Sequence, residues 1–127
     1  MIKIRTFRDI LVWQKSHLLV QEIYRITKLF PMEERYNLTS QMRRAAYSVP
    51  CNIVEGFRRN GKTEGLRFYN IAAASLEELK YQTLLSLDLG YFHREKYLQL
   101  ERQEEELSKM LASWIKANKK IRDEMIS

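Results

Sequence analysis

Basic side chains gather in two parts of this 127-residue sequence, and their types suit them to binding phosphate groups. The stretch 42–67 contains six cations but only two acids, Glu55 and Glu64. On a helix, Arg44 and Arg58 lie within about 40° of each other and roughly 21 Å apart along the axis. Arginine binds phosphate oxygens in a bidentate manner, so such a stripe could follow a nucleic-acid backbone. The six cations are Arg43, Arg44, Arg58, Arg59, Lys62 and Arg67.

A second basic cluster lies near the C-terminal end of the sequence. It consists of Lys116, Lys119, Lys120 and Arg122. We take its three lysines, together with the six cations of the first stretch, as candidate nucleic-acid-binding residues.

The stripe also has a purely structural interpretation. Glu55 precedes Arg58 and Arg59 by three and four residues, an arrangement typical of ion pairs within one helix. Arg43 or Arg44 could pair in the same way with Glu77 or Glu78 of a neighbouring helix. The pattern therefore leaves two alternatives open, anion binding and internal ion pairing.

Residues suited to catalysis or metal binding are scarce. The single cysteine, Cys51, follows Pro50 in an apolar stretch and is expected to be buried and unreactive. His17 comes one turn after Trp13 and is expected either to pack there or to make a polar interface contact. One cysteine and two histidines cannot supply a usual zinc site, the Glu-x-x-His motif of di-iron bundles is absent, and the four glycines fit no phosphate-binding loop. We therefore expect no enzyme activity, no metal and no cofactor.

Three consecutive acids, Glu104 to Glu106, form the one remaining candidate for an acidic site. Arg102 and Lys109 flank them at helical spacing. We interpret the run as a solvated helix face that pairs with these cations.

The periodicity of apolar residues predicts four helices that position these side chains. The first covers residues 7–30 and ends at Pro31, with Ser16 filling a gap in its apolar face. The second runs from an N-cap at Asn37 to Gly61, with a kink expected at Pro50. The expected core positions are Val12, Leu19, Ile23, Ile26 and Phe30 in the first helix and Leu38, Met42, Ala46, Val49, Ile53 and Phe57 in the second.

The third helix is expected from an N-cap at Thr63 to Leu89, before Gly90, and the fourth covers residues 93–125. Tyr69 widens the apolar seam of the third helix. In the fourth, a seam with spacings of three and four residues is interrupted by Glu104 and Asn118, and its other members are Tyr97, Leu100, Leu107, Leu111, Trp114, Ile121 and Met125. Four long helices with short connections predict an all-α, antiparallel up-down-up-down four-helix bundle over residues 1–127. The apolar arcs of the first and third helices are wider than one bundle needs, which favours self-association.

Composition agrees with a helical protein of the cytoplasm. Only four glycines and two prolines occur, fewer than an all-β chain normally uses. A single cysteine, and no apolar run long enough for a signal peptide or a membrane span, favour a reducing compartment and no membrane. The net charge of +6 favours polyanionic partners such as RNA or DNA.

Specific motifs of the chain resemble a known family, the four-helix bundle proteins encoded in intervening sequences of bacterial 23S ribosomal RNA genes. The resemblance begins at residues 7–16 (FRDILVWQKS) and is most specific at 38–56 (LTSQMRRAAYSVPCNIVEG). Residues 75–79 (SLEEL) and 89–91 (LGY) extend it along the third helix. Cys51 and Val54 stand where the family commonly has alanine. Residues 113–120 (SWIKANKK) are similar to the accessory variability proteins of diversity-generating retroelements, which partner a reverse transcriptase.

This resemblance implies an up-down bundle that assembles as a ring-shaped homopentamer with a positively charged surface and no enzyme activity. It also implies binding to RNA or DNA. Three functions follow as hypotheses. The first is a non-enzymatic homo-oligomer that binds nucleic acid by electrostatic contacts, the second is an adaptor that docks a reverse transcriptase or another protein, and the third is a hydrolase with a site between subunits. The shortage of catalytic side chains disfavours the third.

Overall fold

A computed structural model describes residues 3–126 of the chain and contains four long helices. They are α1 (Leu11–Thr27), α2 (Leu38–Arg58), α3 (Lys62–Asp88) and α4 (Arg94–Ile126). Two short 3-10 turns, η1 (Phe7–Asp9) and η2 (Met32–Glu34), precede α1 and α2. The described residues contain no strand. The all-α prediction is therefore confirmed.

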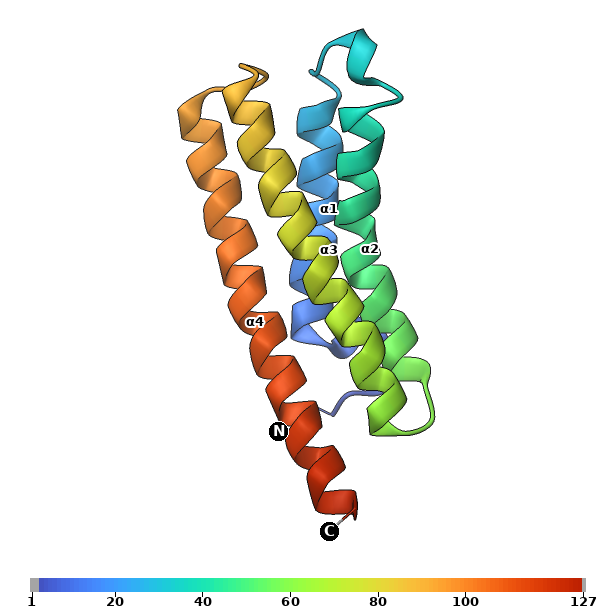
Figure 1. Ribbon diagram of the computed structural model, residues 1–127. Helices are drawn as coiled ribbons and strands as arrows, with labels where there is room; N and C mark the ends of the chain where they lie inside the picture. The colour runs from blue at the N-terminus through green and yellow to red at the C-terminus, as the bar shows by residue number, and fades with distance from the viewer. Residues whose placement is uncertain (1–2, 127) are drawn as a thin grey trace.

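The helices run alternately up and down and pack as a bundle (Figure 1). Each helix packs against the next one along the chain, most extensively α2 against α3, and α4 closes the bundle by returning to α1. This arrangement places α1 and α3 on one diagonal and α2 and α4 on the other. Both the α2–α3 turn and the C-terminal part of α4 lie at the same end of the bundle (Figure 1).

The first helix starts and ends inside its predicted bounds. Thr6 and Asp9 form a capping box that closes the separate turn η1, and Ile10 then takes an extended conformation with φ −80° and ψ 116°. Asp9 accepts hydrogen bonds from the backbone N–H groups of Arg5 and Thr6, which lower the pKa of its carboxyl group. The extended Ile10 is buried and anchors the N-terminal segment, so α1 begins only at Leu11.

The other helix ends show which capping signals were correct. Helix α2 continues through Pro50 to Arg58, which excludes the alternative of two shorter helices. Asn37 takes the N-cap position, but its side chain donates to the carbonyl of Glu33 instead of capping α2. Gly61, with φ +100°, caps α3, so the predicted N-cap at Thr63 was wrong and Thr63 lies in the first turn. Gly90, with φ +77°, ends α3 as predicted: the N–H groups of Gly90 and Tyr91 close the helix on the carbonyls of Leu87 and Ser86.

The predicted apolar faces form the core of the bundle. Ser16 is buried at the predicted gap in α1, and its hydroxyl donates to the carbonyl of Trp13. Leu38 and Phe57, at the two ends of the predicted α2 face, are only partly buried and pack against the core. The residues that confirm the prediction for α1 and α2 are Val12, Leu19, Ile23, Ile26, Phe30, Met42, Ala46, Val49 and Ile53.

Helix α4 departs from its expected pattern at two places. Glu104 is buried, and its carboxylate accepts a 2.6 Å hydrogen bond from Thr83 of α3. The interpretation of Glu104 to Glu106 as one solvated face was therefore wrong for Glu104, and the cations that reach Glu105 and Glu106 are Lys80 and Lys15 of other helices. At the C-terminal end of the seam, Ile121 and Met125 are exposed because α4 projects past the other helices (Figure 1).

Large apolar side chains remain exposed on the outer faces of α1 and α3. Leu11 and Leu18 of α1 are more than half exposed, and Tyr81 of α3 is 63% exposed. These are the two helices whose apolar arcs favoured self-association, which stays a prediction. Within the described residues, no helix combines the length and apolar character needed to cross a membrane.

Candidate nucleic-acid interface

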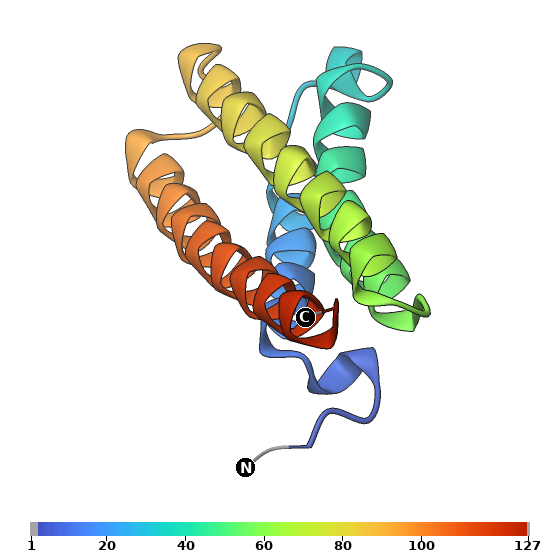
Figure 2. The ribbon, with the colours of Figure 1, turned by 60° about the horizontal axis from the view of Figure 1, so that its bottom comes forward.

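The two basic clusters of the sequence meet at one end of the bundle. The C-terminal end of α2, the N-terminal end of α3 and the C-terminal end of α4 come together there (Figures 1 and 2). The Lys62 ammonium lies 3.4 Å from the Asn118 side-chain oxygen, so residues 56 positions apart in the sequence are in contact. We call this region, made of residues 55–67 and 116–124, the basic end. It holds eight Lys or Arg residues and four Asp or Glu residues.

Arg43 and Arg44 do not belong to the basic end, because they lie in the first half of α2. Arg43 donates to the Thr27 hydroxyl at 2.9 Å and lies over the ring of Tyr24, 4.7 Å from its centroid. It is therefore a packing residue between α1 and α2, and its predicted pairing with Glu77 or Glu78 was wrong. Arg44 lines a shallow, polar hollow with Glu78, but no carboxylate of the described residues lies within ion-pair distance of it.

The arginines of the α2–α3 turn are paired with neighbouring acids. Glu55 lies 3.1 Å from Arg59 and 3.5 Å from Arg58, as the spacing predicted. Arg67 pairs in the same way with Glu64 at 3.3 Å. Such exposed pairs contribute little to stability, but they reduce the charge that each arginine offers to a ligand.

The three lysines of α4 differ from these arginines because they form no ion pair with the described acidic residues. Lys116, Lys119 and Lys120 are exposed, and no carboxylate in residues 3–125 lies within ion-pair distance of any of them. They line a shallow hollow on one side of α4, whereas Arg122 pairs with Asp123 at 2.9 Å. Exposed ammonium groups on long side chains suit the binding of phosphates without base recognition, although Asp123 and Glu124 line the same hollow.

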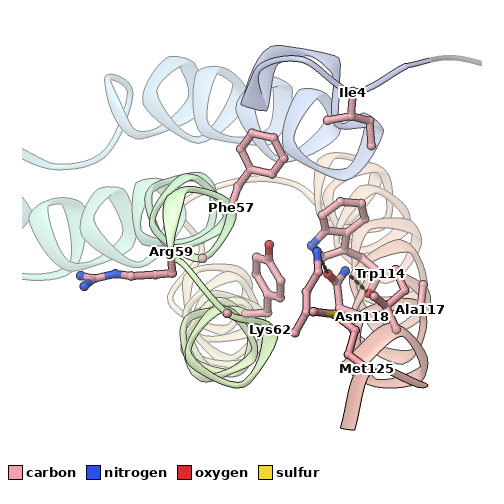
Figure 3. A pocket seen from close by; sticks show the side chains of 12 residues that line it. Ile4, Phe57, Arg59, Lys62, Trp114, Ala117, Asn118 and Met125 are labelled. Atoms are coloured by element: carbon pink, nitrogen blue, oxygen red, sulfur yellow. Dashed lines mark hydrogen bonds between the residues drawn. The ribbon is translucent and has the colours of Figure 1, made fainter. Parts of the chain in front are cut away.

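Between α4 and the α2–α3 turn, the basic end contains a cavity of about 370 Å³ (Figure 3). Its walls include the aromatic rings of Phe57, Tyr69 and Trp114, one from each of α2, α3 and α4. The rings of Tyr69 and Trp114 meet edge to face, with their centroids 5.8 Å apart. Burial raises the pKa of the Tyr69 hydroxyl, and the nearby indole N–H of Trp114 offsets part of that rise.

Helices α2 and α3 approach each other closely beside the wall of the cavity that Tyr69 forms. A Cβ atom on Gly56 would lie 2.8 Å from the carbonyl oxygen of Gly65 and 2.4 Å from the ring of Tyr69. Only glycine fits at this crossing of α2 and α3. The aromatic wall is therefore set by backbone packing rather than by flexible side chains.

Sequence reasoning did not identify the cavity. It placed Phe57, Tyr69 and Trp114 in the core, because aromatic residues at helical spacing usually belong there. The available signal was Asn118, a polar residue at a seam position of α4. It is buried, and its amide donates to the carbonyl of Trp114 while its oxygen faces Lys62.

The remaining candidates for chemistry have structural surroundings. His17 stacks on Trp13, with ring planes 9° apart, as the packing alternative predicted. Cys51, however, is exposed, so the expectation of a buried thiol was wrong: its position on α2 points away from the core next to Pro50. Among the described residues, no cluster of three or more His, Cys, Asp or Glu side chains could hold a metal ion.

Comparisons with known proteins match both the sequence and the fold. The model of the 23S rRNA-intervening sequence protein family matches residues 8–113. The crystal structure of a protein of unknown function from the S23 ribosomal protein family of Bacteroides thetaiotaomicron has a similar fold, with a TM-score of 0.77 and 26% sequence identity. The match covers 84% of this chain and 96% of that chain. No curated protein sequence matches this chain significantly.

Proposed function

The chain belongs to the 23S rRNA-intervening sequence protein family, and on this premise we propose that it is a non-enzymatic, homo-oligomeric protein of the cytoplasm that binds RNA or DNA through its basic end. The observation that carries the proposal is the meeting of two basic clusters at one end, where Lys116, Lys119 and Lys120 form no ion pair with the described acidic residues. The family name connects these proteins with ribosomal RNA genes, which favours RNA as the ligand.

Binding of this kind depends on the phosphate backbone and is independent of base sequence. Each lysine that neutralises a phosphate releases a counterion, so the binding constant falls steeply as salt rises. Assembly of several chains would repeat the basic end and let one strand contact more than one subunit, which raises the effective affinity. The exposed apolar faces of α1 and α3 support such an assembly.

The test is a salt titration of the affinity for a labelled single-stranded RNA, measured by fluorescence anisotropy. The triple variant K116Q/K119Q/K120Q is expected to bind at least tenfold more weakly at low salt. Its plot of log K against log salt should lose about two units of slope. A matched control removes three charges from the opposite end of the bundle, as K28Q/R35Q/R94Q, and is expected to bind like the wild type.

Two outcomes would refute this role. One is the absence of binding to RNA and DNA at low salt, and the other is an equal loss of affinity in both triple variants. The variant R58A/R59A is expected to weaken binding less than the lysine variant, because Glu55 already pairs with both arginines. Light scattering with and without the RNA tests the assembly and its pentameric stoichiometry.

A protein-interaction adaptor is the second candidate, and one observation favours it. The connection between α1 and α2 exposes three large apolar side chains, Leu29, Met32 and Tyr36, at 84%, 78% and 81%. Apolar side chains gathered on one connection suit contact with a protein partner. A gene for a reverse transcriptase and a template repeat beside this gene would favour the adaptor. Placement within a ribosomal RNA gene would favour nucleic-acid binding.

A further inference from the structure

The cavity at the basic end has a composition that points to a particular class of ligand. Aromatic and aliphatic side chains make up most of its wall, and the lining residues that the structure describes include two cations, Arg59 and Lys62, but no carboxylate (Figure 3). Its volume of about 370 Å³ falls within the range of pockets that hold small organic ligands. An anionic ligand with an aromatic or apolar part fits these walls.

Only one of the two cations is available to a ligand in the cavity. The guanidinium of Arg59 points away from it, toward Glu55 and the ring of Phe68 (Figure 3). The ammonium of Lys62 instead lies against Asn118, at a distance of 3.4 Å that is long for a hydrogen bond. A phosphate at the mouth of the cavity would be a stronger partner for Lys62 than this amide oxygen.

The cavity wall also holds a hydrogen-bond donor without a well-placed acceptor. The indole N–H of Trp114 is buried and makes no well-formed hydrogen bond with the described residues, although it lies close enough to the Tyr69 hydroxyl to lower the pKa of that group. Such orphaned donors are uncommon because burial removes the water that would otherwise bind them. Because this N–H has almost no accessible surface, an acceptor atom of a ligand reaches it only when the Trp114 ring shifts, so binding is expected to change the surroundings of Trp114.

We propose that the cavity takes one unstacked nucleotide of a single strand, with its base against the partly exposed ring of Trp114 and its phosphate on Lys62. Nucleobases carry ring nitrogen or carbonyl acceptors at their edges, which match the Trp114 N–H, and their faces stack on aromatic side chains. A duplex keeps its bases paired and stacked and cannot place one in the cavity. The inference rests on the proposed function, because the lysines of α4 bring the strand to this end.

The first experiment uses the emission of Trp114 as the reporter. The variant W13F leaves Trp114 as the only tryptophan of the chain. It is titrated with an eight-nucleotide RNA, with an abasic phosphate chain of the same length, and with a duplex of the same sequence, while anisotropy follows total binding. The single-stranded RNA is expected to quench Trp114. The abasic chain and the duplex are expected to bind at low salt without quenching.

The second experiment blocks the cavity while leaving the charge unchanged. Ala117 is exposed and lines the cavity, so A117L in the W13F background fills it without removing a cation. The matched control is A112L, an exposed alanine of the same helix outside the cavity. Both variants are expected to keep the wild-type helicity, and A117L is expected to weaken the quenching constant about tenfold, as loss of one stacked base does. The variant K62Q is expected to weaken the quenching constant more than K119Q does.

The outcomes separate this proposal from the proposed function. Binding seen by anisotropy without quenching of Trp114, or equal quenching in A117L and A112L, would overturn the nucleotide site and leave the basic end as a backbone-binding surface. Equal quenching by the single strand and the duplex would also overturn it. A strand that produces no anisotropy change at low salt would refute nucleic-acid binding as a whole.

Discussion

At the end of the bundle where α1 meets α2 and α3 meets α4, aromatic rings fill the interior, whereas at the basic end they surround a cavity. Phe30 packs on Tyr91 and Phe92, with ring centroids 5.1 and 6.2 Å away. The Tyr91 hydroxyl there donates a 2.6 Å hydrogen bond to Glu34. At the basic end, the Trp114 N–H makes no well-formed hydrogen bond and the α4 lysines make no ion pair with any residue that the structure describes.

Charge differs between the two ends in the same way. We call the end that carries the α1–α2 and α3–α4 connections, residues 28–37 and 88–101, the sealed end. These two connections hold four Lys or Arg and five Asp or Glu residues. At the basic end, cations outnumber acids two to one. At the sealed end, the paired polar groups stabilise the fold. The exposed lysines of the basic end are solvated instead, so they contribute little to the stability of the fold. The two ends therefore differ in how far their polar groups are paired, and the proposed function assigns binding to the basic end.

The largest loss of stability should come from removing a buried aromatic ring at the sealed end. Phe30 is 7% exposed, so F30A removes a buried ring and should lower the free energy of unfolding by about 3–5 kcal/mol. The counterpart F57A removes a partly buried ring from the cavity wall and should cost only about 1–2 kcal/mol. Urea denaturation of both variants measures the difference. Equal losses would contradict the distinction between the two ends.

The two polar interruptions of the α4 seam should differ in their response to pH. Burial raises the pKa of Glu104 to about 7, while the hydrogen bond from Thr83 and the charge of Lys80 oppose this rise and Glu101 and Glu105 add to it. The folded state thus binds this proton more tightly than the unfolded state, so stability falls as pH rises from about 4.5 to about 7, by about 3 kcal/mol. Thermal unfolding as a function of pH measures the loss. The variant E104Q should remove it, whereas N118A should keep the wild-type pH profile.

A smaller effect is expected where α2 and α3 cross beside the cavity. The Cβ of G56A would meet the ring of Tyr69 and the backbone of Gly65, so the helices must separate at a cost of about 1–3 kcal/mol. Near-ultraviolet circular dichroism should change as well, because Tyr69 contacts Trp114. The control G61A puts a methyl group into open space and strains only the backbone. Its aromatic spectrum should match the wild type, and a matching spectrum in G56A would contradict the close approach.

The smallest effect is spectroscopic and concerns the sealed end alone. The hydrogen bond to Glu34, together with burial and the charges of Glu34 and Glu33, raises the pKa of Tyr91 to about 12. NMR of labelled tyrosine should therefore find Tyr91 mostly protonated at pH 11, where free tyrosine is mostly ionised. The variant E34Q should shift its titration to lower pH. An unchanged titration in E34Q would show that Glu34 is not the cause.

Local signals in the sequence predicted the helices and most of their buried faces. The apolar period identified Ile23, Met42 and Leu107 as core positions, because a helix buries the same face at every turn. The pairing of Glu55 with Arg58 and Arg59 was predictable for the same reason. The start of α1 was not predictable from the sequence. The apolar period continues back to Phe7, but the buried, extended Ile10 interrupts the helix there.

By itself, the sequence determined the helical class, the four segments and the basic character of the two clusters, since these properties depend on residues within one or two turns. Only the tertiary structure decided which side chains from different helices are in contact. It brought Lys62 to Asn118, buried Glu104 against Thr83 and separated Arg43 from the basic end. It also formed the cavity from one ring on each of three helices. Such contacts depend on how far each helix extends and where it crosses its neighbours, and these are properties of the packed bundle.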